Sequence, residues 1–160
     1  GTDKVVIPIG NYSFNEAEIR FQSGELRNIW GTIGYRSGKF YGGNRQQKTA
    51  GIGWRPSSHF QFTLNYTVND VQLPYGDFDT ELIQSRSDII FSSTMSWSTL
   101  IQYDNITEAV GINTRLHWIP RAGQEAFIVL NHNLQDIDLN NRFKSTLADL
   151  AVKFNYTFRF

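Results

Sequence analysis

Apolar and polar residues alternate with a period of two along most of this 160-residue chain. Between Phe60 and Val68 every second residue is apolar and the residues between them are polar, and the segment from Leu150 to Phe160 repeats this pattern. Because successive side chains of a β-strand point to opposite faces, the alternation predicts strands with one apolar and one polar face. Apolar spacing of three and four residues is not sustained anywhere, so we expect almost no helix.

The alternation divides the chain into nine segments. Most have about ten to fifteen residues, longer than the roughly 5–6 typical of soluble sheets and long enough to cross a bilayer, which takes about 9–11 tilted residues. The strand count stays open between eight and ten, because single-chain bacterial barrels have an even number of strands. Residues 4–9 are a candidate tenth strand; alternatively, one of the nine is wrong. The nine segments are 12–22, 25–41, 45–55, 59–69, 80–91, 94–104, 107–119, 124–133 and 146–160.

The connections between these segments are of two kinds. Tight turns are expected at 23–24, 56–58, 92–93 and 121–123, where Ser, Gly and Pro gather. Longer or looser links are expected at 42–44, 69–80, 104–105 and 133–145. Short turns at one rim and longer loops at the other are typical of an outer-membrane barrel.

Composition excludes several classes of protein. Fifteen basic and fifteen acidic residues cancel, so we expect no nucleic-acid partner. The chain has no cysteine, which excludes disulfides and thiolate metal sites. No uninterrupted apolar run reaches the ~18 residues of a membrane-spanning helix.

The period alone does not say which face meets lipid, because a soluble lipocalin-type barrel alternates too, with its apolar face inside. The aromatic residues favour a membrane. The tryptophans of three strands share the apolar face and lie near short turns, whereas two tyrosines lie near the opposite strand ends. Amphipathic rings prefer the headgroup level of a bilayer. We therefore predict two aromatic girdles, one with Trp54, Trp97, Trp118 and Phe60 and one with Tyr66 and Tyr103.

Charged residues of both signs share the polar face. In a narrow lumen such groups would pair, bond across the barrel or hold water. The predicted lumen charges are Glu16, Glu18, Arg20, Arg55, Arg86, Asp88, Arg115, Asp149, Lys153 and Arg159.

The last segment ends in aromatic residues at every second position. This arrangement resembles the C-terminal signal by which bacterial outer-membrane barrels are recognised by the barrel-assembly machinery. A final edge strand with an exposed aromatic row is readable by strand addition. The predicted assembly signal is Phe154, Tyr156, Phe158 and Phe160.

Several stretches beyond about residue 25 resemble the C-terminal barrel of a large bacterial family of unassigned activity. Its longer members place a family-9-like carbohydrate-binding module ahead of an outer-membrane barrel. The resemblance implies a surface-facing barrel, either complete in these residues or forming the C-terminal part of a larger barrel. The carbohydrate-binding module is absent from these residues, so no sugar-binding role is carried over. The stretches are 38–43, 54–57, 69–74, 102–105, 113–120 and 152–160.

Few residues could carry chemistry. The imidazoles are those of His59, His117 and His132, and only His132 has a candidate partner, Ser145 across the following loop. The run 136–141 resembles the start of a calcium loop but lacks the required Gly and closing Glu. We expect no metal and no cofactor.

We predict one domain over residues 1–160, an all-β antiparallel up-and-down transmembrane β-barrel of 8–10 strands in the bacterial outer membrane. Its partners would be outer-membrane lipid or detergent, with the barrel either monomeric or completed by other chains. The predicted function is a small passive pore or a membrane scaffold or anchor, without catalysis. Two alternatives stay open: a lipid-modifying enzyme that uses His132, and a soluble lipocalin-like binder of a small ligand.

Overall fold

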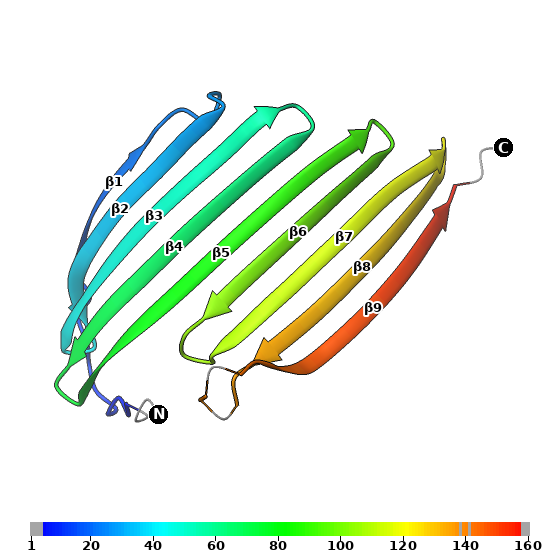
Figure 1. Ribbon diagram of the computed structural model, residues 1–160. Coiled ribbons are helices and arrows are strands. Elements are labelled where there is room, and N and C mark those ends of the chain that lie inside the picture. Colours follow the sequence, from blue (N-terminus) through cyan, green and yellow to red (C-terminus); the bar gives the residue numbers. More distant parts are fainter. Residues whose placement is uncertain (1–4, 138, 141, 158–160) are drawn as a thin grey trace.

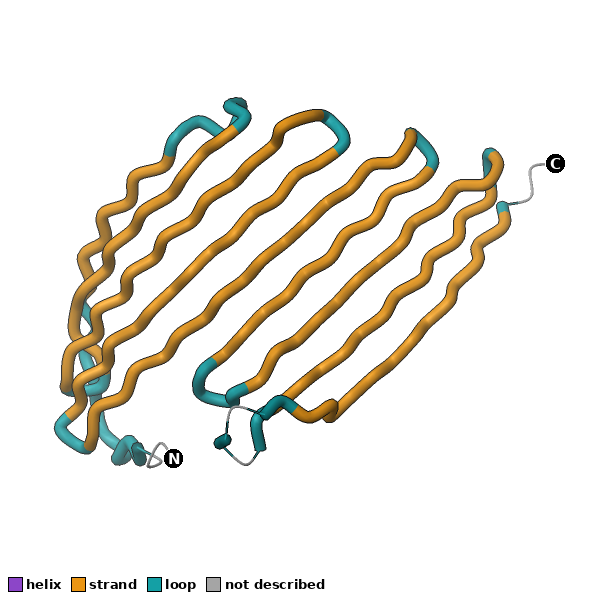
Figure 2. The backbone as a smooth tube through the Cα atoms, viewed as in Figure 1, coloured by secondary structure: helices purple, strands orange, loops and turns teal. Residues whose placement is uncertain are grey.

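A computed structural model describes residues 5–137, 139–140 and 142–157. Within them, nine strands form one sheet and no residue is helical (Figures 1 and 2). Each of the nine predicted segments overlaps one strand. The strands are β1 (Glu16–Gln22), β2 (Ile29–Phe40), β3 (Gly43–Ser57), β4 (Phe60–Leu73), β5 (Gly76–Ser92), β6 (Met95–Asp104), β7 (Ala109–Arg121), β8 (Gln124–Gln135) and β9 (Lys144–Tyr156).

The strands follow one another across the sheet in chain order, and every neighbouring pair is antiparallel. The predicted all-β, antiparallel, up-and-down arrangement is therefore confirmed. β1 and β9 form the two edges and do not pair with each other, so the sheet is open rather than closed into a barrel (Figure 1).

Two of the predicted loose links are tight turns instead. The expected loop over 69–80 is strand on both sides of Pro74 and Tyr75, because β4 continues to Leu73 and β5 begins at Gly76. The alternation changes phase there, because Val71 and Leu73 lie on the face opposite to that of Leu64, but the backbone ladder does not depend on the alternation. The link at 42–44 is a turn at Tyr41 and Gly42, both with positive φ (45° and 81°), the combination that a two-residue type I′ hairpin requires.

The candidate tenth strand at residues 4–9 is wrong for its described part. Residues 5–9 have no strand conformation, and Pro8 has no N–H to give to a ladder. The chain is held by other contacts: the Tyr12 hydroxyl donates to the Pro8 carbonyl (2.6 Å), and its ring packs edge-on against Tyr41 at 5.3 Å. A regular ladder begins only at Glu16.

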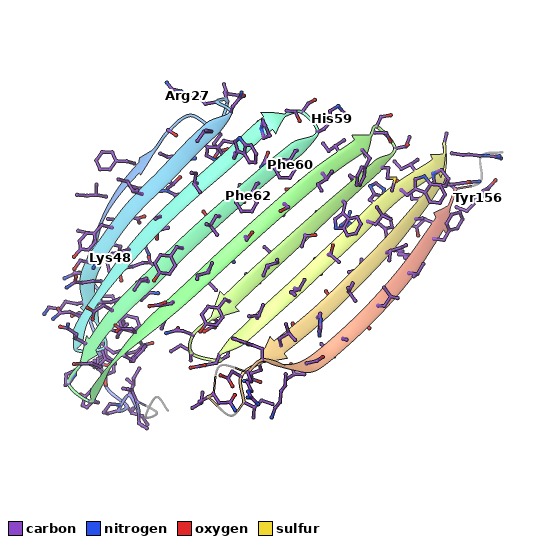
Figure 3. The ribbon with its side chains drawn as sticks, in the orientation of Figure 1. Arg27, Lys48, His59, Phe60, Phe62 and Tyr156 are labelled. Atoms are coloured by element: carbon purple, nitrogen blue, oxygen red, sulfur yellow. The ribbon has the colours of Figure 1, made fainter. Side chains whose placement is uncertain are left out.

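The register of the ladders assigns every strand residue to one of two faces. We call the face that carries Trp54 the apolar face and the opposite one the polar face. One row of paired residues on the apolar face runs through Trp54, Phe62, Ser87, Thr99, Thr114, Leu130 and Leu150. Figure 3 shows Phe60 and Phe62, both on this face, in the upper part of β4, and Lys48 in the lower part of β3.

The sheet curves around its polar face. The buried apolar side chains among the described residues are Trp30, Val71 and Leu73, and the register places all three on the polar face. Side chains of the apolar face stay open, with 70% of Val152 and 61% of Ile33 exposed. Figure 2 shows that the sheet is curved, with β1 lying behind β2.

Candidate functional site

Nine of the ten predicted lumen charges lie on the polar face, as the register of their strands requires. The tenth, Arg159, lies outside the described residues. The nine are Glu16, Glu18, Arg20, Arg55, Arg86, Asp88, Arg115, Asp149 and Lys153.

Four charges from β1, β2 and β3 form one network, which we call the paired-charge cluster: Glu16, Glu18, Arg36 and Arg45. Arg36 Nη2 lies 2.6 Å from Glu18 Oε2, and its Nη1 lies 3.9 Å from Glu16 Oε2. Arg45 pairs with the other oxygen of Glu16. Two cations thus face two anions, and charge is balanced within the cluster.

A glycine allows this pairing across three strands. Glu16, Gly38 and Arg45 are laterally adjacent in β1, β2 and β3. A Cβ on Gly38 would lie 2.2 Å from the Asn15 carbonyl oxygen and 2.8 Å from Glu16 Cγ. Because Gly38 has no side chain, Arg45 reaches over β2 to Glu16. Sequence analysis missed Arg36 and Arg45. Arg36 alternates with Tyr35, but Arg45 lies among polar residues, where the sequence has no alternation to place it on the face of Glu16.

A second group of charges lies at the opposite end of the polar face, near the turns at 58–59, 93–94 and 122–123. We call it the arginine cluster: Arg55, Arg86, Asp88, Arg115 and His117. Arg86 holds Asp88 through two bonds of 2.9 and 3.0 Å. Asp88 is the one carboxylate among three guanidinium groups in this cluster, so it carries a positive excess.

Aromatic rings support two of these arginines. The Arg55 guanidinium lies 5.2 Å from the ring centre of Trp30 and donates to Gln61 Oε1 at 2.9 and 2.6 Å. The Arg115 guanidinium lies 5.0 Å from the ring centre of Phe127, a distance at which a cation is attracted to an aromatic face.

His117 completes the arginine cluster. Its ring stacks on Phe127 with centroids 4.5 Å apart and planes 4° apart. Within the described part of the chain, its Nε2 is buried and has no hydrogen bond. The sequence gave no signal for the aromatic platform of Phe127 that His117 and Arg115 share.

Trp30 is the most closely packed side chain beneath this cluster. It is only 9% exposed and lies directly on the backbone of Gly53, its antiparallel partner. A Cβ on Gly53 would come within 2.0 Å of Trp30 Cε2. An aromatic ring laid over a strand glycine fills the space that the missing side chain leaves.

The predicted girdle residues share the apolar face and fall into rows. Tyr66 and Tyr103 lie in one row, separated by Ile83. At the other end, Phe60 and Trp97 flank Ile89 in one row. In addition, Trp54 meets Phe60 edge-on at 5.6 Å, and Trp118 pairs with Met95 and Ala126.

Three polar groups on the apolar face bond to one another. Trp97 Nε1 donates to Thr99 Oγ1 at 2.9 Å and to Thr114 Oγ1 at 2.6 Å, and the two hydroxyls are 2.9 Å apart. Thr114 Oγ1 also donates to the Ser98 carbonyl at 3.3 Å, so each side-chain polar atom of the triad has a partner within the protein.

His132 and Ser145 are in contact, as the sequence suggested. His132 Nε2 lies 3.0 Å from Ser145 Oγ. A bulge between Asn133 and Leu134 adjusts the register of β8 and β9 beside Ser145. No carboxylate in the described residues bonds to the His132 ring, so the pair lacks the third group that orients a catalytic base. His59 is engaged elsewhere, since its Nδ1 lies 2.8 Å from the Ile90 carbonyl oxygen.

Of the predicted assembly signal, Phe154 and Tyr156 lie on the apolar face of the edge strand β9. Phe158 and Phe160 lie outside the described residues.

The described residues contain no group of three or more His, Asp or Glu side chains arranged to hold a metal ion. A search of them for a helix long and apolar enough to span a membrane also found none. No protein-family model matches the chain, and neither curated proteins nor solved structures give a match. The family resemblance described above therefore stays a prediction.

Proposed function

We propose that the nine strands form the wall of a bacterial outer-membrane β-barrel that serves as a small passive pore or as a membrane scaffold or anchor, with no catalytic step. One observation carries this proposal: each of the nine strands has exposed apolar side chains on the same face of the sheet, including Leu150 at 64% and Val152 at 70%. Soluble monomers rarely expose a continuous apolar surface of this kind.

The rows of aromatic residues support a bilayer as the solvent of this face. Phe60 and Tyr66 in β4, and Trp97 and Tyr103 in β6, are separated by the same number of residues, about 20 Å along a strand. An outer-membrane barrel has an apolar band about 25 Å tall between two aromatic girdles. Beyond the tyrosine row, the same face becomes charged at Lys48, Asp70, Asp79 and Glu81.

The triad of Trp97, Thr99 and Thr114 supports the same environment. An unpaired polar group in hydrocarbon costs several kcal/mol. On a surface in contact with water, these hydroxyls would hydrogen-bond to the solvent instead of to each other. Their mutual bonds leave the apolar face without an unsatisfied side-chain group at this point.

The direction of curvature argues against the soluble lipocalin-like alternative. A lipocalin keeps its apolar face inside the barrel. Here the buried side chains Trp30, Val71 and Leu73 lie on the polar face, which forms the inside of the curve.

The four tryptophans provide a direct test. Trp54, Trp97 and Trp118 lie on the apolar face, and Trp30 lies on the polar face. Four variants, each keeping one tryptophan and replacing the others by Phe, would be refolded into phosphatidylcholine vesicles with brominated acyl chains. Bromine quenches fluorescence only at short range. We expect strong quenching of Trp54, Trp97 and Trp118 and little quenching of Trp30, which is the internal control.

Equal quenching at all four positions would show that the faces are not sorted by lipid. A monodisperse folded protein in buffer without detergent or lipid would overturn the membrane proposal and favour a soluble binder.

The choice between pore and scaffold depends on the polar face. If water fills a closed lumen, the positive excess of the arginine cluster favours anions over cations. Conductance across a planar bilayer, with an anion preference that Arg115→Gln reduces, would support the pore. Absence of conductance from a closed barrel would leave the scaffold.

The contact of His132 with Ser145 sustains one alternative function, a lipid-modifying enzyme. The Ser145 hydroxyl would attack a lipid ester while the His132 imidazole takes its proton. The ester C–O bond would break, the alcohol would leave with that proton, and water would then release the acyl group from Ser145. The test is hydrolysis of phospholipid or lipopolysaccharide esters by the folded protein. Activity that is lost in both His132→Ala and Ser145→Ala would overturn the passive role, whereas the absence of activity is expected.

The edge strand β9 is the proposed binding site for the barrel-assembly machinery. With Phe154 and Tyr156 exposed on one face, β9 offers the barrel-assembly machinery an aromatic edge for strand addition. Replacing both by Ser should slow insertion into the outer membrane in cells more than it slows refolding into detergent.

A further inference from the structure

The two edge strands point the same way. Eight successive antiparallel pairings connect β1 to β9, so the arrowheads of both strands point upward in Figure 1. Joining these edges directly would create one parallel pair in an otherwise antiparallel sheet.

The free edge of β9 exposes the backbone of its apolar-face residues. The Thr157 N–H donates to the Gly123 carbonyl at 2.7 Å, in phase with the β8–β9 ladder. Bonded pairs alternate in an antiparallel ladder, so Ala151 and Lys153 bond to β8. The N–H and C=O groups of Leu150, Val152 and Phe154 point away from the sheet.

The free edge of β1 exposes the backbone of its polar-face residues instead. Lys39 N–H donates to the Asn15 carbonyl at 2.9 Å, and Ser23 N–H donates to the Gly31 carbonyl at 2.9 Å. Both bonds are in phase with the β1–β2 ladder. The backbone groups of Glu18 and Arg20 therefore point outward, and both residues belong to the polar face.

β1 and β9 therefore cannot pair with each other as antiparallel strands, because they run in the same direction and because their free backbone groups belong to residues of opposite faces. Residues that exchange hydrogen bonds in an antiparallel ladder share a face, but β9 offers apolar-face residues and β1 offers polar-face residues. One added strand corrects both, because each strand bonds to its two neighbours through residues of opposite faces. Any odd number of added strands has the same effect.

A second copy does not supply such a strand in a membrane. A copy in the same orientation brings its β1 parallel to β9. A copy that pairs β9 with β9 antiparallel would have to be inverted across the bilayer, whereas insertion from one side gives one orientation.

We infer that an odd number of further antiparallel strands, beyond these 160 residues, completes the sheet between the edge of β9 and the edge of β1. This inference rests on the proposed membrane function. The first added strand places apolar residues beside Leu150, Val152 and Phe154 and polar residues beside Asp149 and Lys153, which continues both faces.

Amide hydrogen exchange in detergent micelles, resolved by NMR, tests the inference. In the 160-residue chain we expect β3–β8 to be protected along their length. In β9, Ala151 and Lys153 should be protected, whereas Leu150, Val152 and Phe154 should exchange at rates close to those of open peptide.

A matched pair of proline variants probes the same edge. Ala151→Pro removes an N–H bonded to β8 and should speed exchange in the adjoining part of β8 roughly tenfold or more. Val152→Pro removes an N–H that points outward and should change that exchange less than about twofold.

Two extended variants test whether the number of added strands must be odd. A copy of Gln124–Gln135 joined after residue 160 by an Asn-Gly turn provides a tenth strand antiparallel to β9, and a copy of the whole hairpin from Gln124 to Tyr156 provides two strands. The ten-stranded variant should protect Glu18 and Arg20 in β1, and the eleven-stranded variant should leave them open.

The outcomes separate the two proposals. Protection of both edges in a monomer, or in a dimer with contacts between β9 strands, would overturn the inference and keep the membrane proposal. Equal protection of β1 in the ten- and eleven-stranded variants would overturn it as well. A chain with no detergent-dependent protection in β3–β8 would instead refute the membrane function, and the inference with it.

Discussion

The polar face carries two groups of charges that are organised in different ways. In the paired-charge cluster, Arg36 and Arg45 face Glu16 and Glu18, and each guanidinium meets a carboxylate. In the arginine cluster, the one carboxylate, Asp88, pairs with Arg86, and the other two guanidinium groups lie over aromatic rings.

This difference distinguishes charges that stabilise the sheet from charges that remain available to bind ions. The paired-charge cluster joins β1, β2 and β3, and its own four charges cancel. The arginine cluster keeps a positive excess, held in place by Trp30 and Phe127 rather than by counterions. If the proposed lumen holds water, ions would respond to the second cluster and not to the first.

The largest expected effect comes from the support under the arginine cluster. Gly53→Ala would place a methyl group 2.0 Å from the Trp30 ring, so Trp30 and the Arg55 above it must shift. Overpacking of this kind typically costs about 1–3 kcal/mol. We expect a loss of about 2 kcal/mol in the free energy of unfolding, measured by urea titration in detergent micelles.

Gly34→Ala is the matched control, because it lies on the same face beside the paired-charge cluster. Its Cβ would approach no atom closer than 3.8 Å, at Thr49 Cβ, so the expected change is below about 0.5 kcal/mol. Equal losses in the two variants would contradict the tight packing of Trp30 on Gly53.

A smaller effect is expected in the paired-charge cluster. Glu16→Gln removes the carboxylate that Arg45 bonds, and partly exposed ion pairs of this kind contribute about 0.2–1 kcal/mol. The loss should shrink as salt rises, because salt screens exposed charges. A double-mutant cycle with Arg45→Met isolates the pair, and a coupling energy of zero at low salt would show that the two residues do not interact.

The strands were predictable because their alternation is local. An apolar side chain at every second residue marks β4 and β9 directly, and the alternation in their strands also places Arg86, Arg115 and Asp149 on the polar face. The turns were less predictable where the pattern fails. Near Pro74 the alternation changes phase, since Asp70 lies on the apolar face and Val71 on the polar face, and only the ladder of β4 with β5 shows that the strands continue.

The contacts within the site could not be predicted, since they depend on register between strands. Whether Arg45 reaches Glu16 depends on Gly38 lying between them in β2, and alternation in one strand does not give its offset from the next. Trp30 was missed for the same reason, because its packing on Gly53 is a property of paired strands. The edge strands β1 and β9 run in the same direction and so cannot pair antiparallel to close the sheet. The only indication of this in the sequence was that the predicted segments number nine, which is odd.

The smallest expected effect distinguishes aromatic support from ion pairing. Arg115→Lys keeps the charge but replaces the planar guanidinium over Phe127 by an ammonium group, which stacks less well. We expect a loss of about 0.5 kcal/mol in the same urea titration, and the loss should stay constant between low and high salt because no carboxylate partner is removed. A loss that fades with salt, as expected for Glu16→Gln, would mean that Arg115 is held by charge. The two clusters would then differ in composition only, and not in the way that their arginines are fixed.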